Sequence, residues 1–169
     1  PAPWSERPDS TLPVTGVLWA EAANYCGWRH PPDGRLPSEE EWEAAARGTS
    51  GRRYPWGSEW SPAAAATVSA RRTAPSPVGS YPSGRTPEGV EDLIGNVWEW
   101  TRSPMAPYPG GAPMPGVGGK YVIRGGAFST YDSLASTTQR AASDQSLGRQ
   151  LLDGTGFRCA MPLRRADGR

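Results

Sequence analysis

The chain is poor in several features that common classes of protein require. Only one of its 169 residues is a histidine, His30, which we interpret as a surface residue and not as a metal ligand. No apolar run is long enough to span a membrane, and no signal peptide is visible. The glycine-rich motif that binds phosphate is also absent. A formal net charge of +1 gives no general attraction to nucleic acid or to acidic membranes, so we expect neither as a partner.

Turn-forming residues and tryptophan are abundant instead. Twenty-one glycines and 19 prolines indicate many turns and little regular secondary structure. Eight tryptophans supply enough apolar area for the core of one domain of this length. We interpret residues 1–13 as an extended lead-in, 14–163 as the domain and 164–169 as a tail. Because the chain begins at Pro1 without a methionine, we expect it to be the C-terminal part of a longer protein with an upstream domain.

Two helices are predicted from apolar spacing and from capping residues. Apolar residues recur at helical spacing over Ala20–Trp28. Ser38 is better explained as the start of a second helix than as a nucleophile, because Glu41 three residues later completes a capping box. Most of the remaining chain is predicted to be loop, with short strands at Tyr121–Ile123 and Phe157–Met161.

The stretch Glu91–Thr101 combines two carboxylates with a tight turn. Asp92 and Glu99 flank Gly95-Asn96, a dipeptide that adopts left-handed or turn conformations at little cost. Such a turn can direct main-chain carbonyls toward the same point as both carboxylates. These oxygens are the ligands that calcium prefers. The alternative is an ordinary buried turn with one exposed acid.

Several ordered motifs in the chain resemble those of a known family. Asp92–Thr101 resembles the signature of the formylglycine-generating enzyme (sulfatase-modifying factor) family. Further matching segments follow in family order at Val14–Trp28, Arg35–Gly48, Tyr54–Gly57, Pro77–Pro82, Arg124–Phe128 and Gly156–Ala160. The resemblance implies an α+β fold of the C-type-lectin-like type, with two helices, small twisted antiparallel sheets and much irregular loop. Fold alone does not determine function.

A structural calcium site is one implication of the resemblance. Matching motif positions would supply its ligands: Asp92 and Glu99 through their carboxylates, and Gly95 and Val97 through their carbonyl oxygens. A second calcium site of the family uses an asparagine near the position of Thr67. Threonine is a poorer ligand, so we expect this second site to be lost.

The resemblance also implies a disulfide between Cys26 and Cys159, which stand at the family's paired positions. From the residues alone, two buried free thiols are an equal alternative. A disulfide would indicate an oxidising compartment, which in a bacterium is extracytoplasmic or at the cell surface, or the cytoplasm of a thermophile.

Catalysis in the resembled family depends on residues that this chain lacks. The family's oxidase, which converts a substrate cysteine to formylglycine, binds copper through two cysteines. Thr130 and Ala135 stand at those positions, and neither side chain binds copper or supplies a thiol. A related sulfoxide-forming branch uses a histidine iron site that a single histidine cannot build. We therefore expect no copper and no enzyme activity. The alternatives are an oxidase relative with altered chemistry and a sensory or accessory domain, as in some bacterial kinases.

Residues 129–138 are rich in small and hydroxylated side chains and lack helical or strand periodicity. This composition is typical of adaptable binding loops, and a plain polar loop is the alternative. It also resembles the variable proteins of diversity-generating retroelements, which vary between the Arg-Gly-Gly and Gly-Phe-Arg segments. We predict a non-catalytic surface that binds a protein and not a sugar, because the lectin sugar-binding motif is absent. The predicted contacts are Ser129, Thr130, Tyr131, Asp132, Ser133, Ala135, Thr137, Gln139, Gln145 and Arg149.

Overall fold

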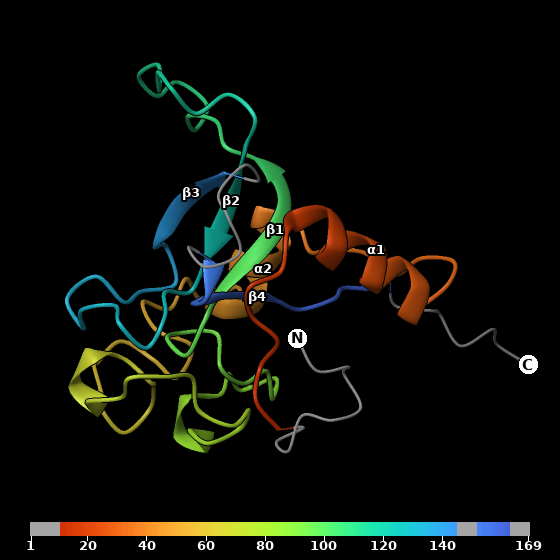
Figure 1. Cartoon of the computed structure of the whole chain (residues 1–169). Helices are drawn as coiled ribbons and strands as arrows, with labels where there is room; N and C mark the ends of the chain where they lie inside the picture. The colour runs from red at the N-terminus through yellow and green to blue at the C-terminus, as the bar shows by residue number, and fades with distance from the viewer. Residues whose placement is uncertain (1–10, 145–151, 163–169) are drawn as a thin grey trace, which may run out of the picture.

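The computed structural model describes residues 11–144 and 152–162. Two helices, two short 3-10 turns and one four-stranded sheet account for the regular structure of these residues (Figure 1). The elements are α1 (Trp19–Arg29), α2 (Glu39–Arg47), η2 (Val68–Ala70), η3 (Pro82–Gly84), β1 (Trp98–Pro104), β2 (Lys120–Arg124), β3 (Arg140–Asp144) and β4 (Thr155–Phe157). The predicted α+β fold with two helices and much loop is confirmed.

The sheet has the strand order β3-β2-β1-β4 and is mixed. β1 pairs antiparallel with β2, and β2 antiparallel with β3. β4 runs parallel to β1, with Trp98 opposite Thr155 and Trp100 opposite Phe157. The pairing of β1 with β4 is therefore parallel, whereas only antiparallel sheets were expected. The strand order places β4 at the opposite edge of the sheet from β3, so the chain crosses the sheet before it enters β4. After Phe157 the chain leaves the sheet, and Ala160 makes only an isolated bridge with Arg35.

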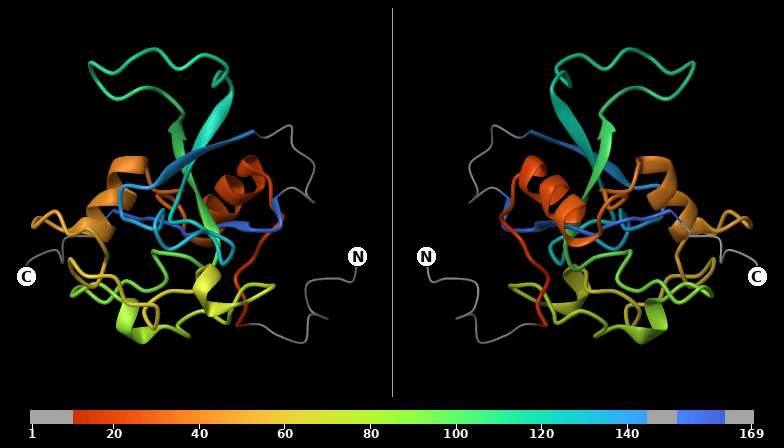
Figure 2. Two further views of the ribbon diagram at one scale, coloured as in Figure 1. Left: turned by 90° about the vertical axis from the view of Figure 1, so that its left-hand side faces the viewer. Right: turned by 90° about the vertical axis from the view of Figure 1, so that its right-hand side faces the viewer.

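The two helices cover opposite faces of the sheet (Figure 2). Successive residues of a strand point to opposite faces, and β1 follows this rule. Trp100 is fully buried in the cluster that contains Ala22 and Cys26 of α1. The preceding residue, Glu99, accepts a hydrogen bond from the Nε1 of Trp42 on α2 at 2.7 Å. One face of the sheet is thus apolar and the other carries buried charges.

Local sequence signals explain where α2 begins and ends. The Oγ of Ser38 accepts a hydrogen bond from the backbone N–H of Glu41 at 3.2 Å, and the backbone N–H of Ser38 donates to the Oε2 of Glu41 at 2.8 Å. This reciprocal pair is the predicted capping box. Gly48 ends the helix with a φ of 57°, a conformation that glycine adopts easily.

A disulfide joins α1 to the segment after β4. Cys26 and Cys159 are 133 residues apart in sequence, and their Cα atoms lie 5.4 Å from each other. Closing so long a loop reduces the conformational entropy of the unfolded chain, which stabilises the fold by about 4–5 kcal/mol on the chain-entropy model. Within residues 11–144 and 152–162, no helix combines the length and the apolar character needed to cross a membrane.

Candidate functional site

The Gly95-Asn96 turn lies just before β1 and connects three loops. Gly95 and Asn96 have φ values of 76° and 61°. Their backbone N–H groups donate to the carbonyls of Gly125 at 2.9 Å and Ala66 at 2.8 Å, respectively. The side-chain amide of Asn96 accepts from the N–H of Ser76 at 2.8 Å and donates to its carbonyl at 3.2 Å. The conformation of the turn is therefore fixed by hydrogen bonds to three separate segments of the chain.

Asp92 and Glu99 both line a cavity of about 490 Å³, but their partners differ. Glu99 is 5% exposed and accepts from the Nε and Nη2 of Arg158, each at 2.6 Å. Asp92 accepts from the backbone N–H of Gly79 at 2.7 Å. Burial raises the pKa of Asp92 above its usual value, although the Gly79 bond and the charge of Arg158 oppose the shift.

These residues are compatible with the predicted calcium ion, which stays a prediction. Burial raises the pKa of the half-buried Asp92 carboxyl, and a bound cation would stabilise its charged form. Arg158 already neutralises Glu99, so calcium would compete with this guanidinium. In the part of the chain that the structure describes, no group of three or more His, Cys, Asp or Glu side chains is arranged so that it could hold a metal ion by itself. Main-chain carbonyls such as those of Gly95 and Val97 would have to complete the ligand set.

The segment 129–138 lies between β2 and β3 and is anchored through Asp132. The Oδ1 of Asp132 accepts from the Oγ1 of Thr67 at 2.6 Å, and its Oδ2 accepts from Ser69 at 2.5 Å and from Trp60 at 3.1 Å. Partial burial acts to raise the pKa of Asp132, but these hydrogen bonds outweigh it and hold the pKa below its usual range. Both carboxylate oxygens of Asp132 thus accept hydrogen bonds from other residues of the chain, and the hydroxyl of Thr67 is one of the donors.

Two residues predicted to contact a ligand are buried, so this part of the prediction is wrong. Ala135 is 2% exposed and packs against Ala65 and Ile94. Thr137 is fully buried, and its Oγ1 donates to the carbonyl of Arg52 at 2.8 Å. An irregular loop has no periodicity that would reveal which of its side chains face inward.

Three apolar side chains on this loop or on the neighbouring η2 are exposed. Tyr131, Leu134 and Val68 are 65%, 52% and 40% exposed, and we call these three residues the loop patch. The backbone N–H of Val68 donates to the carbonyl of Thr130 at 3.0 Å, which brings η2 against the loop. Nothing in the sequence indicates that Val68 lies next to Thr130, which is about 60 positions later in the chain. Of the other predicted contacts, Ser129 and Ser133 are exposed, Thr130 and Gln139 are half-buried, and Gln145 and Arg149 lie outside the described residues.

The comparison with family models matches residues 3–163 to the sulfatase-modifying factor enzyme 1-like domain. The chain belongs to this family. It is similar to the hercynine oxygenase of Mycobacterium tuberculosis, with 39% identity over 155 residues that cover 84% of the chain and 35% of the relative. It is also similar to the formylglycine-generating enzyme of Streptomyces coelicolor, with 35% identity over 169 residues that cover 88% of the chain and 52% of the relative. The chain thus spans between a third and about half the length of these relatives.

Among solved structures, Treponema denticola variable protein 1 superposes with a TM-score of 0.74 and covers 95% of this chain and 75% of its own. At 21% identity, this likeness shows the C-type-lectin-like fold and nothing of function.

The expectation that the chain is not an enzyme is contradicted by these relatives. Hercynine oxygenase and formylglycine-generating enzyme are both enzymes by name. The expectation depended on Thr130 and Ala135, which stand where the resemblance places the copper-binding cysteines of the family's oxidase. Two substitutions at one site do not decide whether a chain takes part in catalysis, because one fold supports different chemistries.

Proposed function

We propose that this chain is the ligand-binding part of an oxidoreductase related to hercynine oxygenase and formylglycine-generating enzyme. Its oxidising centre would be completed by groups outside this chain. The sequence relatives support the reaction class. The chain's own residues support an oxidising centre that is completed from outside, because both cysteines are joined in a disulfide and only one histidine is present. Thiolate copper and three-histidine iron therefore have too few ligands within this chain.

One observation carries the proposal: two residues of the loop patch, Tyr131 and Leu134, lie on an anchored loop between the two positions where the resemblance places the cysteines of the family's oxidase. Tyr131 and Leu134 lie between Thr130 and Ala135. Asp132 fixes the loop from within by its bonds to Thr67, Ser69 and Trp60. A surface that is already ordered loses less entropy when it binds. The position that performs chemistry in the oxidase is thus occupied here by a preorganised binding surface.

The composition of the loop patch favours a polypeptide as its ligand over a sugar. An exposed tyrosine such as Tyr131 is typical of the aromatic anchors of protein-binding surfaces. Asp132, the charged residue of this loop, has both carboxylate oxygens engaged within the fold, which leaves exposed hydroxyls such as those of Ser129 and Ser133 as the remaining polar groups of the loop. The ligand is therefore a peptide substrate or the surface of the domain that carries the oxidising centre.

Oxygen consumption by the full-length natural protein tests the proposal, with hercynine and a cysteine-containing peptide as probes. We expect oxygen uptake with one of them. Tyr131→Ala should lower kcat/KM about tenfold or more, because the loss of an aromatic anchor commonly costs more than about 1.4 kcal/mol. Trp28→Ala is the control, since Trp28 is also an exposed aromatic residue, on α1. No oxygen uptake with either probe, or equal activity of the two variants, would overturn the proposal.

A further inference from the structure

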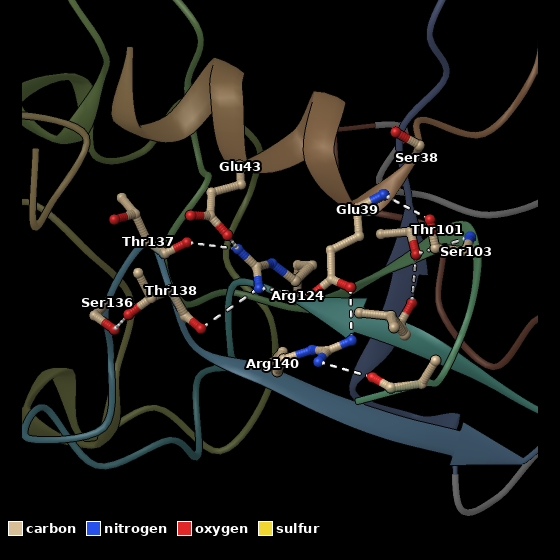
Figure 3. Close-up of polar contacts among 12 residues, drawn as sticks. Ser38, Glu39, Glu43, Thr101, Ser103, Arg124, Ser136, Thr137, Thr138 and Arg140 are labelled. Atoms are coloured by element: carbon tan, nitrogen blue, oxygen red, sulfur yellow. Dashed lines mark hydrogen bonds and ion pairs between the residues drawn. The ribbon is translucent and has the colours of Figure 1, made fainter. Parts of the chain in front are cut away.

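One buried guanidinium joins α2 to the end of the segment 129–138, which carries two residues of the loop patch. Arg124, the last residue of β2, is fully buried. Its Nη1 donates to the Oε1 of Glu39 at 3.0 Å, and its Nη2 donates to the Oε2 of Glu43 at 2.6 Å. Figure 3 shows both glutamates extending from α2 toward this guanidinium. The charge of Arg124 is therefore balanced by two carboxylates of one helix.

The same guanidinium also holds the main chain of the segment (Figure 3). The Nη2 of Arg124 donates to the carbonyl of Thr137 at 2.8 Å, and its Nη1 donates to the carbonyl of Thr138 over a longer distance of 3.4 Å. Thr137 has further partners, because its N–H donates to the carbonyl of Arg53 at 3.0 Å and its Oγ1 to that of Arg52 at 2.8 Å. Each terminal nitrogen of Arg124 thus serves one carboxylate of α2 and one carbonyl of the segment.

Two more arginines fix the carboxylates that hold Arg124. The Oε2 of Glu39 accepts from the Nη2 of Arg140, the first residue of β3, at 2.7 Å. The Oε1 of Glu43 accepts from the Nη1 of Arg47 at 2.7 Å. Each carboxylate therefore pairs with two guanidinium groups, and charge-assisted hydrogen bonds of this kind restrict the geometry of all the groups they join.

The segment has separate attachments at its beginning and in its middle. The Oγ1 of Thr130 accepts from the N–H of Ala127 at 2.9 Å. Asp132 accepts the three hydrogen bonds that anchor the middle of the segment. Leu134 lies between the attachment at Asp132 and the attachment at Thr137, so its position depends on both.

We propose that Arg124 is a positioning residue for the loop patch. Because it is fully buried, it meets no ligand itself. It acts by fixing the carbonyls of Thr137 and Thr138, so that Leu134 is held beside Tyr131 in the arrangement that meets the ligand. The positioning residue has to be an arginine, because a lysine ammonium lacks the planar fork that serves two carboxylates and two carbonyls together. The part of this inference that concerns binding rests on the proposed function.

Amide hydrogen exchange in Arg124→Lys, measured by NMR, tests the positioning without a ligand. The N–H groups of Ala135 and Thr137, which donate to carbonyls of the chain, report on the segment, and those of the β1–β2 ladder report on the sheet. A general loss of stability accelerates exchange through global unfolding in both places alike. We expect exchange in the segment to accelerate about tenfold or more beyond any acceleration in the sheet, because charged hydrogen bonds to the segment are lost.

Arg35→Lys is the matched control for this measurement. Arg35 also pairs with a carboxylate of α2, through two hydrogen bonds to Glu41 at 2.6 Å, but its other side-chain bond goes to the carbonyl of Leu36 and not to the segment. It should leave exchange in the segment, relative to the sheet, as in wild type.

Glu43→Gln tests the same network from α2, and it decides the outcome if Arg124→Lys does not fold. The substitution keeps the size of the side chain but removes the charge that pairs with Arg124. It should accelerate exchange in the segment relative to the sheet, in the same direction as Arg124→Lys. Glu40→Gln, at an exposed position of the same helix, should not.

Oxygen uptake by the full-length natural protein then measures the effect on binding. With the probe that wild type oxidises, Arg124→Lys should raise KM about tenfold and leave kcat unchanged, because the loop patch binds the ligand and the oxidising centre lies elsewhere. Glu43→Gln should raise KM by a smaller factor. Arg35→Lys and Glu40→Gln should leave both constants unchanged.

Either of two results would overturn the proposal. The first is exchange in the folded variants that accelerates equally in segment and sheet, or not at all. The second is a KM in Arg124→Lys equal to that of wild type. If wild type takes up no oxygen with either probe, the proposed function fails, and the exchange measurement still decides whether Arg124 positions the loop patch.

Discussion

The anchoring of the loop patch by Asp132 leads to a quantitative prediction for Asp132→Ala. The substitution removes the acceptor of three hydrogen bonds, from Thr67, Ser69 and Trp60. Hydrogen bonds to a charged group are stronger than hydrogen bonds between neutral groups. Because Asp132 is only half-buried, water can form hydrogen bonds with the donors left without an acceptor, which reduces the cost of the substitution. We therefore expect the free energy of unfolding to fall by about 2 kcal/mol. For a chain of this size the melting temperature should fall by about 4–8 °C.

The pH dependence of this effect provides an internal test. The hydrogen bonds hold the folded-state pKa of Asp132 below its usual value, so its contribution is present above the unfolded pKa of about 3.9 and is lost as the pH falls through the folded pKa. Melting curves by circular dichroism at neutral pH should separate wild type from Asp132→Ala, and the difference should shrink in acid. Asp153→Ala is the control, because Asp153 is exposed. Equal melting temperatures for the two variants at neutral pH would refute the assignment of Asp132 as an anchor.

Three more predictions concern stability. Reducing the disulfide should lower the free energy of unfolding by about 4–5 kcal/mol, and an unchanged denaturant midpoint with and without dithiothreitol would contradict this. Gly95→Ala should destabilise more than Gly116→Ala: both glycines have positive φ, but a Cβ on Gly95 would lie 2.2 Å from the carbonyl oxygen of Ala66, whereas Gly116 has open space. Similar unfolding free energies for the two variants would rule out this close contact. Calcium should raise the melting temperature of wild type but not of Asp92→Ala or Glu99→Ala, and a calcium response that survives in both variants would exclude the predicted site.

Much of the fold was predictable because the relevant signals are local or recur as ordered motifs. Ser38 and Glu41 are three residues apart, so their capping box is visible in the sequence and is present in the structure. The Gly95-Asn96 turn was predictable because only a few residue types tolerate positive φ. The run of motifs from residue 14 to 161 indicated the family, which the comparison then confirmed.

The candidate site was harder to predict because its contacts join distant parts of the chain. Asp132 looked like an exposed ligand contact, but its partners lie 63 to 72 residues earlier in the sequence. The pairing of Arg158 with Glu99 spans 59 residues and changes how the carboxylates next to the turn are neutralised. No periodicity marks either contact, since both depend on how irregular loops pack.

The segment between β1 and β2 has a consequence for how this scaffold can change. Residues 105–119 extend away from the sheet (Figure 1), and Cβ atoms at Gly110, Gly116 and Gly119 would meet nothing within 4 Å. β1 and β2 are paired directly through Glu99–Arg124 and Trp100–Ile123, so the ladder holds the ends of this segment together. Doubling the length of such a loop costs only about 0.6 kcal/mol. This loop is therefore a place where the chain can accept an inserted peptide, whether by evolution or by design, without loss of the sheet.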